Sequence, residues 1–207
     1  MRLPYVFIKP IFTWLISSIP AHNSSSCLVF REITESAYNS TDSSTEKLLK
    51  DKAAGKHQGL LTIQVTSKVF FKDKYYRNTD KNVIYSSLGY AKSIDCHFVK
   101  KNIYEGASFY LITNRGVVQE VWGLPIISPT KDKIAFFSKG MENAVGPNGI
   151  QIFAIEGHNP TNKCTYEVST FEPMCLKWIS NNIMYLKAIA PSSNGGTIKY
   201  YKIIIKN

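Results

Sequence analysis

The chain has 207 residues, of which 25 are Lys or Arg and 15 are Asp or Glu, giving a formal net charge of +10 at pH 7. Hydrophobic residues make up 44% of the chain and aromatic residues 13%, which excludes an intrinsically disordered protein and is typical of a packed globular domain. A positive surplus favours acidic partners, but the lysines are scattered along the sequence, as is usual for solvent-facing sheet surfaces and edges.

Residues 1–21 have the layout of a secretory signal peptide. Arg2 and Lys9 carry the positive charge, an apolar stretch runs from Ile11 to Ile19, and the small residue Ala21 follows. An uncleaved anchor and an ordinary buried segment are the alternatives, although the apolar run is about half of the ~20 residues that span a bilayer. The segment predicts a secreted or periplasmic protein, with no transmembrane span after removal of the leader.

Residues 22–58 are rich in Ser, Thr, Asn and Lys, which predicts a loosely packed arm. Ser43 and Glu46 have the spacing of a capping box and Gly55 follows, so we expect one short helix from Ser44 to Ala54. Cys27 follows three serines beyond the apolar leader, which leaves lipidation of its thiol, and hence envelope anchoring, as an alternative.

Residues 59–207 predict a single all-β domain. Short apolar and aromatic runs are separated by turns containing Asn, Gly or Pro, and few of the intervals could hold a three-turn helix. Antiparallel sheets are therefore expected, arranged as propeller-like or sandwich-like stacked sheets. The runs are 60–67, 68–76, 83–90, 94–99, 107–113, 117–122, 133–138, 149–156, 164–171, 175–180, 183–189 and 198–206.

Residues 125–138, which follow Trp122 and Gly123, form the most informative motif. Ser128-Pro129 and the strand Lys133-Ile134-Ala135-Phe136 resemble the blade signature of TolB-type and related β-propellers, and a weaker echo begins at Trp178. Thr130 stands where that family has Asp, and Lys131 or Asp132 where it has Gly. The resemblance covers residues 122–190 and implies a propeller-like architecture similar to uncharacterised exported bacterial proteins, without implying an activity.

The four cysteines contain no CxxC pair, which argues against a zinc ribbon and a thioredoxin-type site. Cys164 and Cys175 flank two expected strands, and we expect a disulfide between them.

Candidate chemical groups are few. Cys96 and His97 are neighbours in an expected strand and so face opposite sides, whereas Asp95 and His97 share a face and would need a further ligand such as His158 to hold a metal. The glutamates at 105, 120, 156, 167 and 172 show no spacing that selects a glycosidase pair. No metal or other cofactor is predicted.

Two features suggest binding surfaces. The polar loop at residues 140–149 contains Glu142, Asn143 and Asn148, and its glycines would permit close approach of a ligand, although it could equally be a long hairpin connection. The pairs Tyr75-Tyr76 and Tyr200-Tyr201 place one ring on each face of a strand, so at least one member of each pair is expected to be exposed.

The leading functional hypothesis is an exported, non-enzymatic protein that binds or scaffolds a protein or glycan at the cell envelope. One alternative is an envelope hydrolase acting on glycan or peptide, which predicts acidic side chains gathered in the largest cleft. Another is a basic module for an anionic polymer, which predicts lysines on one face. Specific nucleic-acid binding is not expected because no recognised motif accompanies the charge. The sequence does not indicate an oligomeric state.

Overall fold

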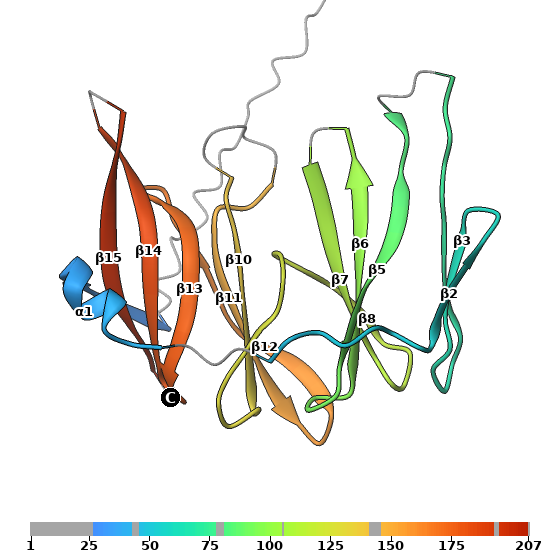
Figure 1. The fold of residues 1–207 in the computed structure, drawn as a ribbon, viewed down its shortest axis with the longest axis horizontal. Coiled ribbons are helices and arrows are strands. Elements are labelled where there is room, and N and C mark those ends of the chain that lie inside the picture. The colour runs from blue at the N-terminus through green and yellow to red at the C-terminus, as the bar shows by residue number, and fades with distance from the viewer. Residues whose placement is uncertain are drawn as a thin grey trace, which may run out of the picture.

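The computed structural model describes residues 27–42, 46–77, 81–104, 106–140, 146–192 and 195–206. In these residues the chain forms four antiparallel sheets and one short helix, which confirms the predicted all-β class. The sheets stand face to face in an open row, with the three-stranded sheet of residues 54–72 at one end and the sheet that contains residues 172–205 at the other (Figure 1).

We number the sheets I to IV along the chain. Sheets I to III are meanders of consecutive strands, and sheet IV is a three-stranded meander that the first strand of the chain joins at its edge. Sheet I contains β2 (Ala54–His57), β3 (Leu60–Ile63) and β4 (Val69–Lys72), and sheet II contains β5 (Ile84–Ala91), β6 (Cys96–Ile103), β7 (Gly106–Thr113) and β8 (Val118–Val121). Sheet III contains β9 (Ile126–Ile127), β10 (Lys133–Ser138), β11 (Gly149–Glu156) and β12 (Asn159–Glu167), and sheet IV contains β13 (Glu172–Ser180), β14 (Ile183–Ser192), β15 (Gly195–Ile205) and β1 (Leu28–Ile33).

Strand β1 completes sheet IV by pairing with the last strand of the chain. The antiparallel register runs from Leu28 opposite Ile205 to Ile33 opposite Tyr200. The expected loose arm is therefore wrong for this segment. The backbone of β1 fills the free edge of β15, an interaction between the two ends of the chain that local composition does not reveal.

The helix also lies elsewhere than expected. Helix α1 (Glu35–Asn39) begins after Thr34, whose side-chain oxygen accepts a hydrogen bond from the Ala37 amide at 3.2 Å. Of the expected helix at 44–54, Ser44 lies outside the described residues and residues 46–53 form an extended strap instead. Leu49 pairs through its backbone with Tyr90 of β5, so pairing with sheet II replaces the internal hydrogen bonds of a helix.

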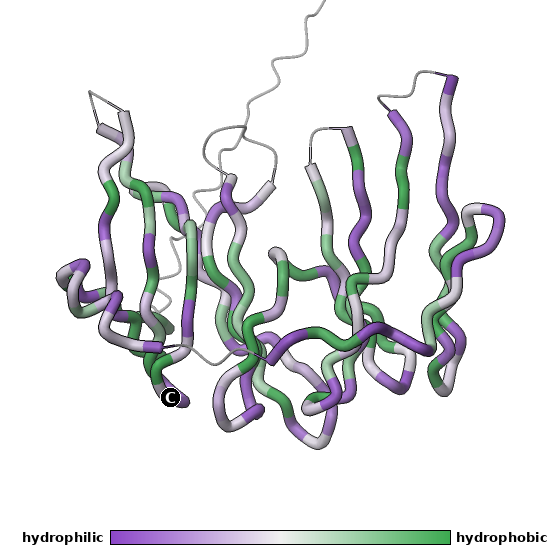
Figure 2. The backbone as a smooth tube through the Cα atoms, viewed as in Figure 1, coloured by the Kyte–Doolittle hydropathy of each residue, from purple (hydrophilic) through white to green (hydrophobic). Residues whose placement is uncertain are grey.

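Three apolar clusters hold the row together, one at each interface between neighbouring sheets. Strand β10 shows how a single strand serves two interfaces: Ile134 and Phe136 pack toward sheet II, whereas Ala135 packs toward sheet IV. The hydropathy colouring shows apolar residues along the middle of the inner strands and polar residues at the turns (Figure 2). Sheets II and III are thus apolar on both faces, unlike a sheet with one solvent-exposed side.

The turn that carries the propeller-like motif joins sheets III and IV. The carboxylate of Asp132 accepts hydrogen bonds from Ser128 Oγ at 3.1 Å, from Asn181 Nδ2 in the β13–β14 turn at 3.0 Å, and from Lys133 Nζ at 3.1 Å. Lys131 adopts a left-handed backbone with φ of 62°, at one of the two positions where the propeller signature usually has glycine. The motif residues therefore stabilise this turn and its contact with the β13–β14 turn.

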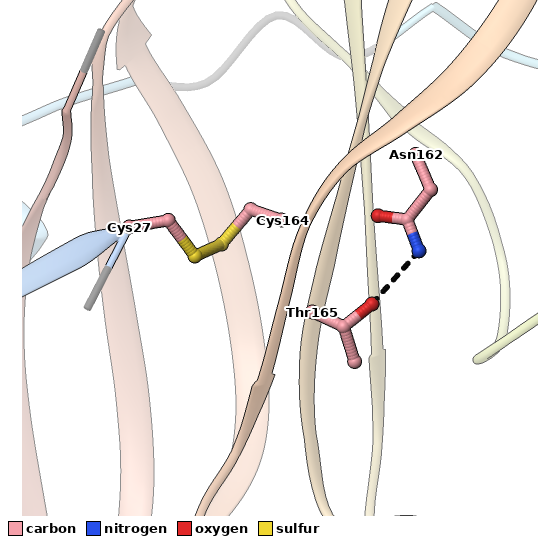
Figure 3. Close-up of a disulfide and its surroundings, with 4 residues drawn as sticks. All are labelled: Cys27, Asn162, Cys164 and Thr165. Atoms are coloured by element: carbon pink, nitrogen blue, oxygen red, sulfur yellow. Dashed lines mark hydrogen bonds between the residues drawn. A yellow bond between two sulfur atoms is a disulfide. The ribbon is translucent and has the colours of Figure 1, made fainter. Parts of the chain in front are cut away.

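The disulfide connects Cys27, just before β1, with Cys164 in β12, and so crosses from sheet IV to sheet III (Figure 3). The expected Cys164–Cys175 bridge is wrong: Cys175 is a free, exposed thiol. Leu176 and Trp178 of β13 face the cluster that contains Cys164, so the intervening alternation turns Cys175 to the other face. With its sulfur in this bridge, Cys27 is not available for lipidation.

No helix in the described ranges is long and apolar enough to cross a membrane. The expected leader at residues 1–21 lies outside those ranges.

Replacing both bridge cysteines, Cys27→Ser with Cys164→Ser, should lower the free energy of unfolding by about 2–5 kcal/mol, because the bridge closes a long loop in the unfolded chain. Urea unfolding under non-reducing conditions measures the change. Cys175→Ser is the control and should alter stability by no more than about 0.5 kcal/mol. A larger loss of stability in Cys175→Ser than in the double variant would contradict the Cys27–Cys164 pairing.

Stability should fall in acid partly through Asp132. Burial alone would raise the pKa of this carboxyl, but hydrogen bonds from Thr130, Asn181, Lys133 and Ser128 outweigh it and hold the pKa well below its usual range. The stabilisation is thus present above the unfolded-state pKa of about 4 and is lost as the pH falls toward the folded-state pKa.

Urea unfolding of the Asp132→Asn variant between about pH 5 and pH 2 should show a smaller acid-induced loss than the wild type. Asp42→Asn, at an exposed position, should keep the wild-type slope. Parallel curves for Asp132→Asn and wild type would show that this turn does not contribute to acid sensitivity.

Candidate functional site

The strap, residues 46–53, crosses the row of sheets on one side on its way to β2 (Figure 1). Leu49 and Tyr90 exchange two backbone hydrogen bonds of 2.9 Å, and the carbonyl of Ala53 accepts the amide of Gln64. The Glu46 side chain accepts the amide of Ser93 at 3.2 Å. The strap therefore binds to sheet II and to the turn that follows β3.

A buried Asp–His pair anchors the middle of the strap. Asp51 Oδ2 lies 2.8 Å from His97 Nδ1, and the two side chains are 2% and 7% exposed. The other oxygen, Asp51 Oδ1, accepts the amide of Ala53 at 2.9 Å. Because Asp51 satisfies one imidazole nitrogen, it fixes the orientation of the ring.

Tyr90 and Asp95 extend this polar cluster. The Tyr90 ring lies 4.8 Å from the His97 ring, and its hydroxyl donates to Asp95 Oδ1 at 2.7 Å. This hydrogen bond to a carboxylate, together with burial, raises the pKa of Tyr90 to about 12. Asn114 donates to the second oxygen of Asp95 at 2.9 Å. Asp95 is thus bonded to Tyr90 and Asn114, while His97 bonds Asp51.

Asp95 and His97 would need a third ligand such as His158 to hold a metal. His158 lies in the turn after β11, and no group of three or more potential metal ligands occurs within the described ranges. His97 does not face solvent, because it is 5% exposed and covered by the strap. Asp51, the residue that covers it, comes from a segment expected to be helical.

Two cavities are lined in part by residues of the strap. The polar cavity, about 620 Å³, is lined by the Asp51–His97 pair and by neighbouring polar residues of the strap and turns. The strap cavity, about 660 Å³, is lined by Glu46, Lys92, Ser93, Ile127, Ser128, Pro129 and Lys131.

An aromatic cavity of about 500 Å³ lies where sheets II, III and IV approach one another, and Glu46 lines both this cavity and the strap cavity. Its apolar lining includes Phe109, Trp122, Leu124 and Phe137, and Leu124 is 56% exposed. Phe109 and Trp122 also line a neighbouring cavity of about 290 Å³. These three cavities adjoin one another through shared lining residues, and together these connected cavities are the candidate binding site.

The nucleophile candidate Cys96 is separated from His97 by strand alternation, as predicted. Cys96 is fully buried in the interface between sheets II and III. Burial raises the pKa of its thiol to about 12, and the nearby Asp95 carboxylate adds to the shift. The sulfur therefore stays protonated at neutral pH and is a poor nucleophile.

The glutamates proposed as a possible hydrolytic pair are dispersed. Glu120 lines the 290 Å³ cavity, Glu156 forms an ion pair with Lys163 at 3.0 Å, and Glu172 is buried in β13. Glu167 ends β12, and Glu105 lies outside the described residues.

The expected binding loop is only partly described. Glu142 and Asn143 lie outside the described residues, whereas Asn148 is placed. Its side-chain amide donates to the carbonyls of Val168 at 2.6 Å and Phe171 at 2.8 Å, and its oxygen accepts the amide of Gly140 at 3.3 Å. Asn148 therefore holds two connections together and has little capacity left for a ligand.

The two tyrosine pairs differ. Tyr75 and Tyr76 are 67% and 50% exposed, although the Tyr75 hydroxyl donates to buried Asp73 at 3.0 Å. Tyr200 is only 9% exposed and donates to Glu35 at 2.6 Å. Tyr201 is half-buried and stacks on Phe171, so the expectation of an exposed ring in this pair is wrong. Helix α1 and β1, which cover the Tyr200-Tyr201 region, come from the segment expected to be loose.

Comparisons with protein-family models, with curated proteins and with solved structures found no match. The candidate site is therefore interpreted from its geometry and chemistry.

Replacing Asp51 by Ala should lower the free energy of unfolding by about 3 kcal/mol, because it leaves the His97 imidazole and the Ala53 amide without their partner. Lys52→Ala, one residue along the strap at an exposed position, should change stability by no more than about 0.5 kcal/mol. Chemical unfolding measures both. Equal stabilities of the two variants would refute the anchoring role of Asp51.

Proposed function

We propose that this chain is an exported, non-enzymatic protein that binds a glycan or protein partner at the cell envelope through the cavities along the strap. The observation that carries the proposal is the aromatic cavity at the meeting of three sheets, connected through Glu46 to the strap cavity. Concave sites with an apolar floor and a few polar groups are the usual form of ligand sites in proteins.

Export is supported by two features. The first 21 residues have the charge and apolar pattern of a cleavable leader. The Cys27–Cys164 bridge would persist in an oxidising compartment and would be reduced in most cytosols. A secreted or periplasmic location is therefore proposed, with a partner outside the cytosol.

A binding role is favoured over hydrolysis by the state of the acidic groups. Glu46 is the carboxylate lining the strap cavity, and it already accepts the Ser93 amide. In the polar cavity, Asp51 and Asp95 are bonded to His97 and Tyr90 respectively. A hydrolase would be expected to keep two carboxylates free on either side of a bound substrate.

The likeness to TolB-type propellers stays a prediction. The meander order within each sheet is what that resemblance would imply, and the row of sheets is open. Fold alone does not assign function.

Export is tested by expressing the full-length chain with its own leader, fractionating the cells and measuring intact mass under non-reducing conditions. We expect an exported species that begins near His22 and is two hydrogens lighter than the reduced chain, as the single bridge requires. An uncleaved, reduced, cytosolic species would contradict the proposed export.

Binding is tested with that mature protein in co-sedimentation with isolated envelope fragments. We expect retention that periodate oxidation abolishes if the partner is a glycan, and that protease treatment abolishes if it is a protein. Trp122→Leu should weaken retention, whereas Tyr76→Leu, an aromatic substitution at an exposed position that is not among the cavity-lining residues, should not. Release of sugar reducing ends or peptides would contradict the non-enzymatic proposal.

A further inference from the structure

Three exposed lysines surround the connected cavities. Lys92 and Lys131 line the strap cavity, and Lys139 lines the aromatic cavity. None of the three forms an ion pair within the described part of the chain. In contrast, Lys133, Lys163 and Lys199 are each paired with a carboxylate. Charges without a partner are the ones available to an anionic ligand.

Glu46 is the acidic residue that lines these two cavities, and its carboxylate already accepts the Ser93 amide. Three lysines against one carboxylate leave the pair of cavities positive. The hydroxyl of Ser93, whose residue lines the strap cavity, is buried and has no hydrogen-bond partner in the described residues. That oxygen is buried, so the charged groups open to a ligand in this cavity are those of the exposed lysines.

Aromatic rings lie beside these charges. Phe109 and Trp122 line both the aromatic cavity and the neighbouring 290 Å³ cavity, so they lie where these two cavities adjoin. Neither residue lines the strap cavity, where Lys92 and Lys131 lie. The indole of Trp178 differs, because it is 3% exposed and donates to the carbonyl of Ile126 inside the core. Of the two indoles in the described ranges, Trp122 is therefore the one available for stacking against an apolar ring face.

We infer that the ligand of these connected cavities is an acidic polysaccharide. Its carboxylates would bind Lys92, Lys131 and Lys139 by charge-assisted hydrogen bonds, and a sugar ring would stack on Trp122. This inference rests on the proposed function and names the chemical class of its ligand. Single-stranded nucleic acid has a similar combination of charge and stacking, but the exported location proposed above favours a polysaccharide.

The test uses the mature, disulfide-bonded protein and polygalacturonate fragments, with fully methyl-esterified fragments as the neutral match. Titration calorimetry and tryptophan fluorescence report binding. We expect the acid form to bind with an affinity that falls as salt rises, and the neutral form to bind at least about tenfold more weakly. Dextran sulfate in a parallel arm distinguishes carboxylate from sulfate as the preferred anion.

Two lysine variants separate local charge from net charge. Lys92→Ser with Lys131→Ser and Lys139→Ser should weaken binding at least about tenfold and flatten the salt dependence. Lys68→Ser with Lys74→Ser and Lys206→Ser removes the same charge from exposed positions that do not line these cavities, and should change affinity less than about twofold. Trp122→Leu should remove the fluorescence change and weaken binding. Unfolding curves establish that each variant is folded.

Equal binding of neutral and acidic fragments, or equal losses in the two lysine variants, would overturn the inference while leaving a glycan-binding function intact. Tighter binding of a single-stranded oligonucleotide than of any polysaccharide would overturn it in favour of a nucleic acid. Envelope retention that is sensitive only to protease would overturn it in favour of a protein partner. Absence of any retention by envelope fragments would remove the proposed function itself.

Discussion

The structure depends on burial of both faces of sheets II and III. Strand alternation sends Cys96 and Phe98 into the interface with sheet III, and Val99 and Ile112 into the interface with sheet I. Neither sheet could stand alone in water, because each would leave one apolar face exposed. Stacking is therefore the condition under which the meanders become stable, and it also determines which turns and first strands come together along the strap.

The two ends of the row are closed by different means. At sheet IV, β1 pairs with β15, α1 packs over the outer face, and Cys27 is bonded to Cys164 of sheet III. At sheet I the outer face carries exposed Phe70 and no covering element comparable to α1 in the described residues. The strap pairs with sheet II and leads into β2 of sheet I, so the Asp51–His97 contact holds the entry to sheet I against sheet II. Backbone pairing, a covalent bond and a buried polar pair thus supplement the hydrophobic interfaces.

The cavities follow from this arrangement. Strand β9, the first strand of sheet III, has only two residues, and its Ile127 lines the strap cavity together with Glu46. Trp122 and Leu124, in the connection from β8 to β9, line the aromatic cavity because the chain must pass there from sheet II to sheet III. A surface that is apolar, aromatic and bordered by unpaired lysines is the feature of this molecule that most resembles a ligand site. The deep polar groups, by contrast, are mutually bonded and stabilise the fold.

The sequence by itself determined the class of fold. The alternation within runs such as 133–138 and 183–189, and the Asn, Gly and Pro turns between them, predicted antiparallel strands, because these are properties of neighbouring residues. It also placed Cys96 and His97 on opposite faces. Tertiary structure alone decided the partner of Cys164, the extended form of the strap and the burial of Tyr200. Each of these depends on contacts between distant segments: β1 with β15, Leu49 with Tyr90, and α1 with sheet IV. Local propensity for a helix at 44–54 amounts to a few tenths of a kcal/mol per residue, and sheet pairing with burial of Leu48 outweighs it.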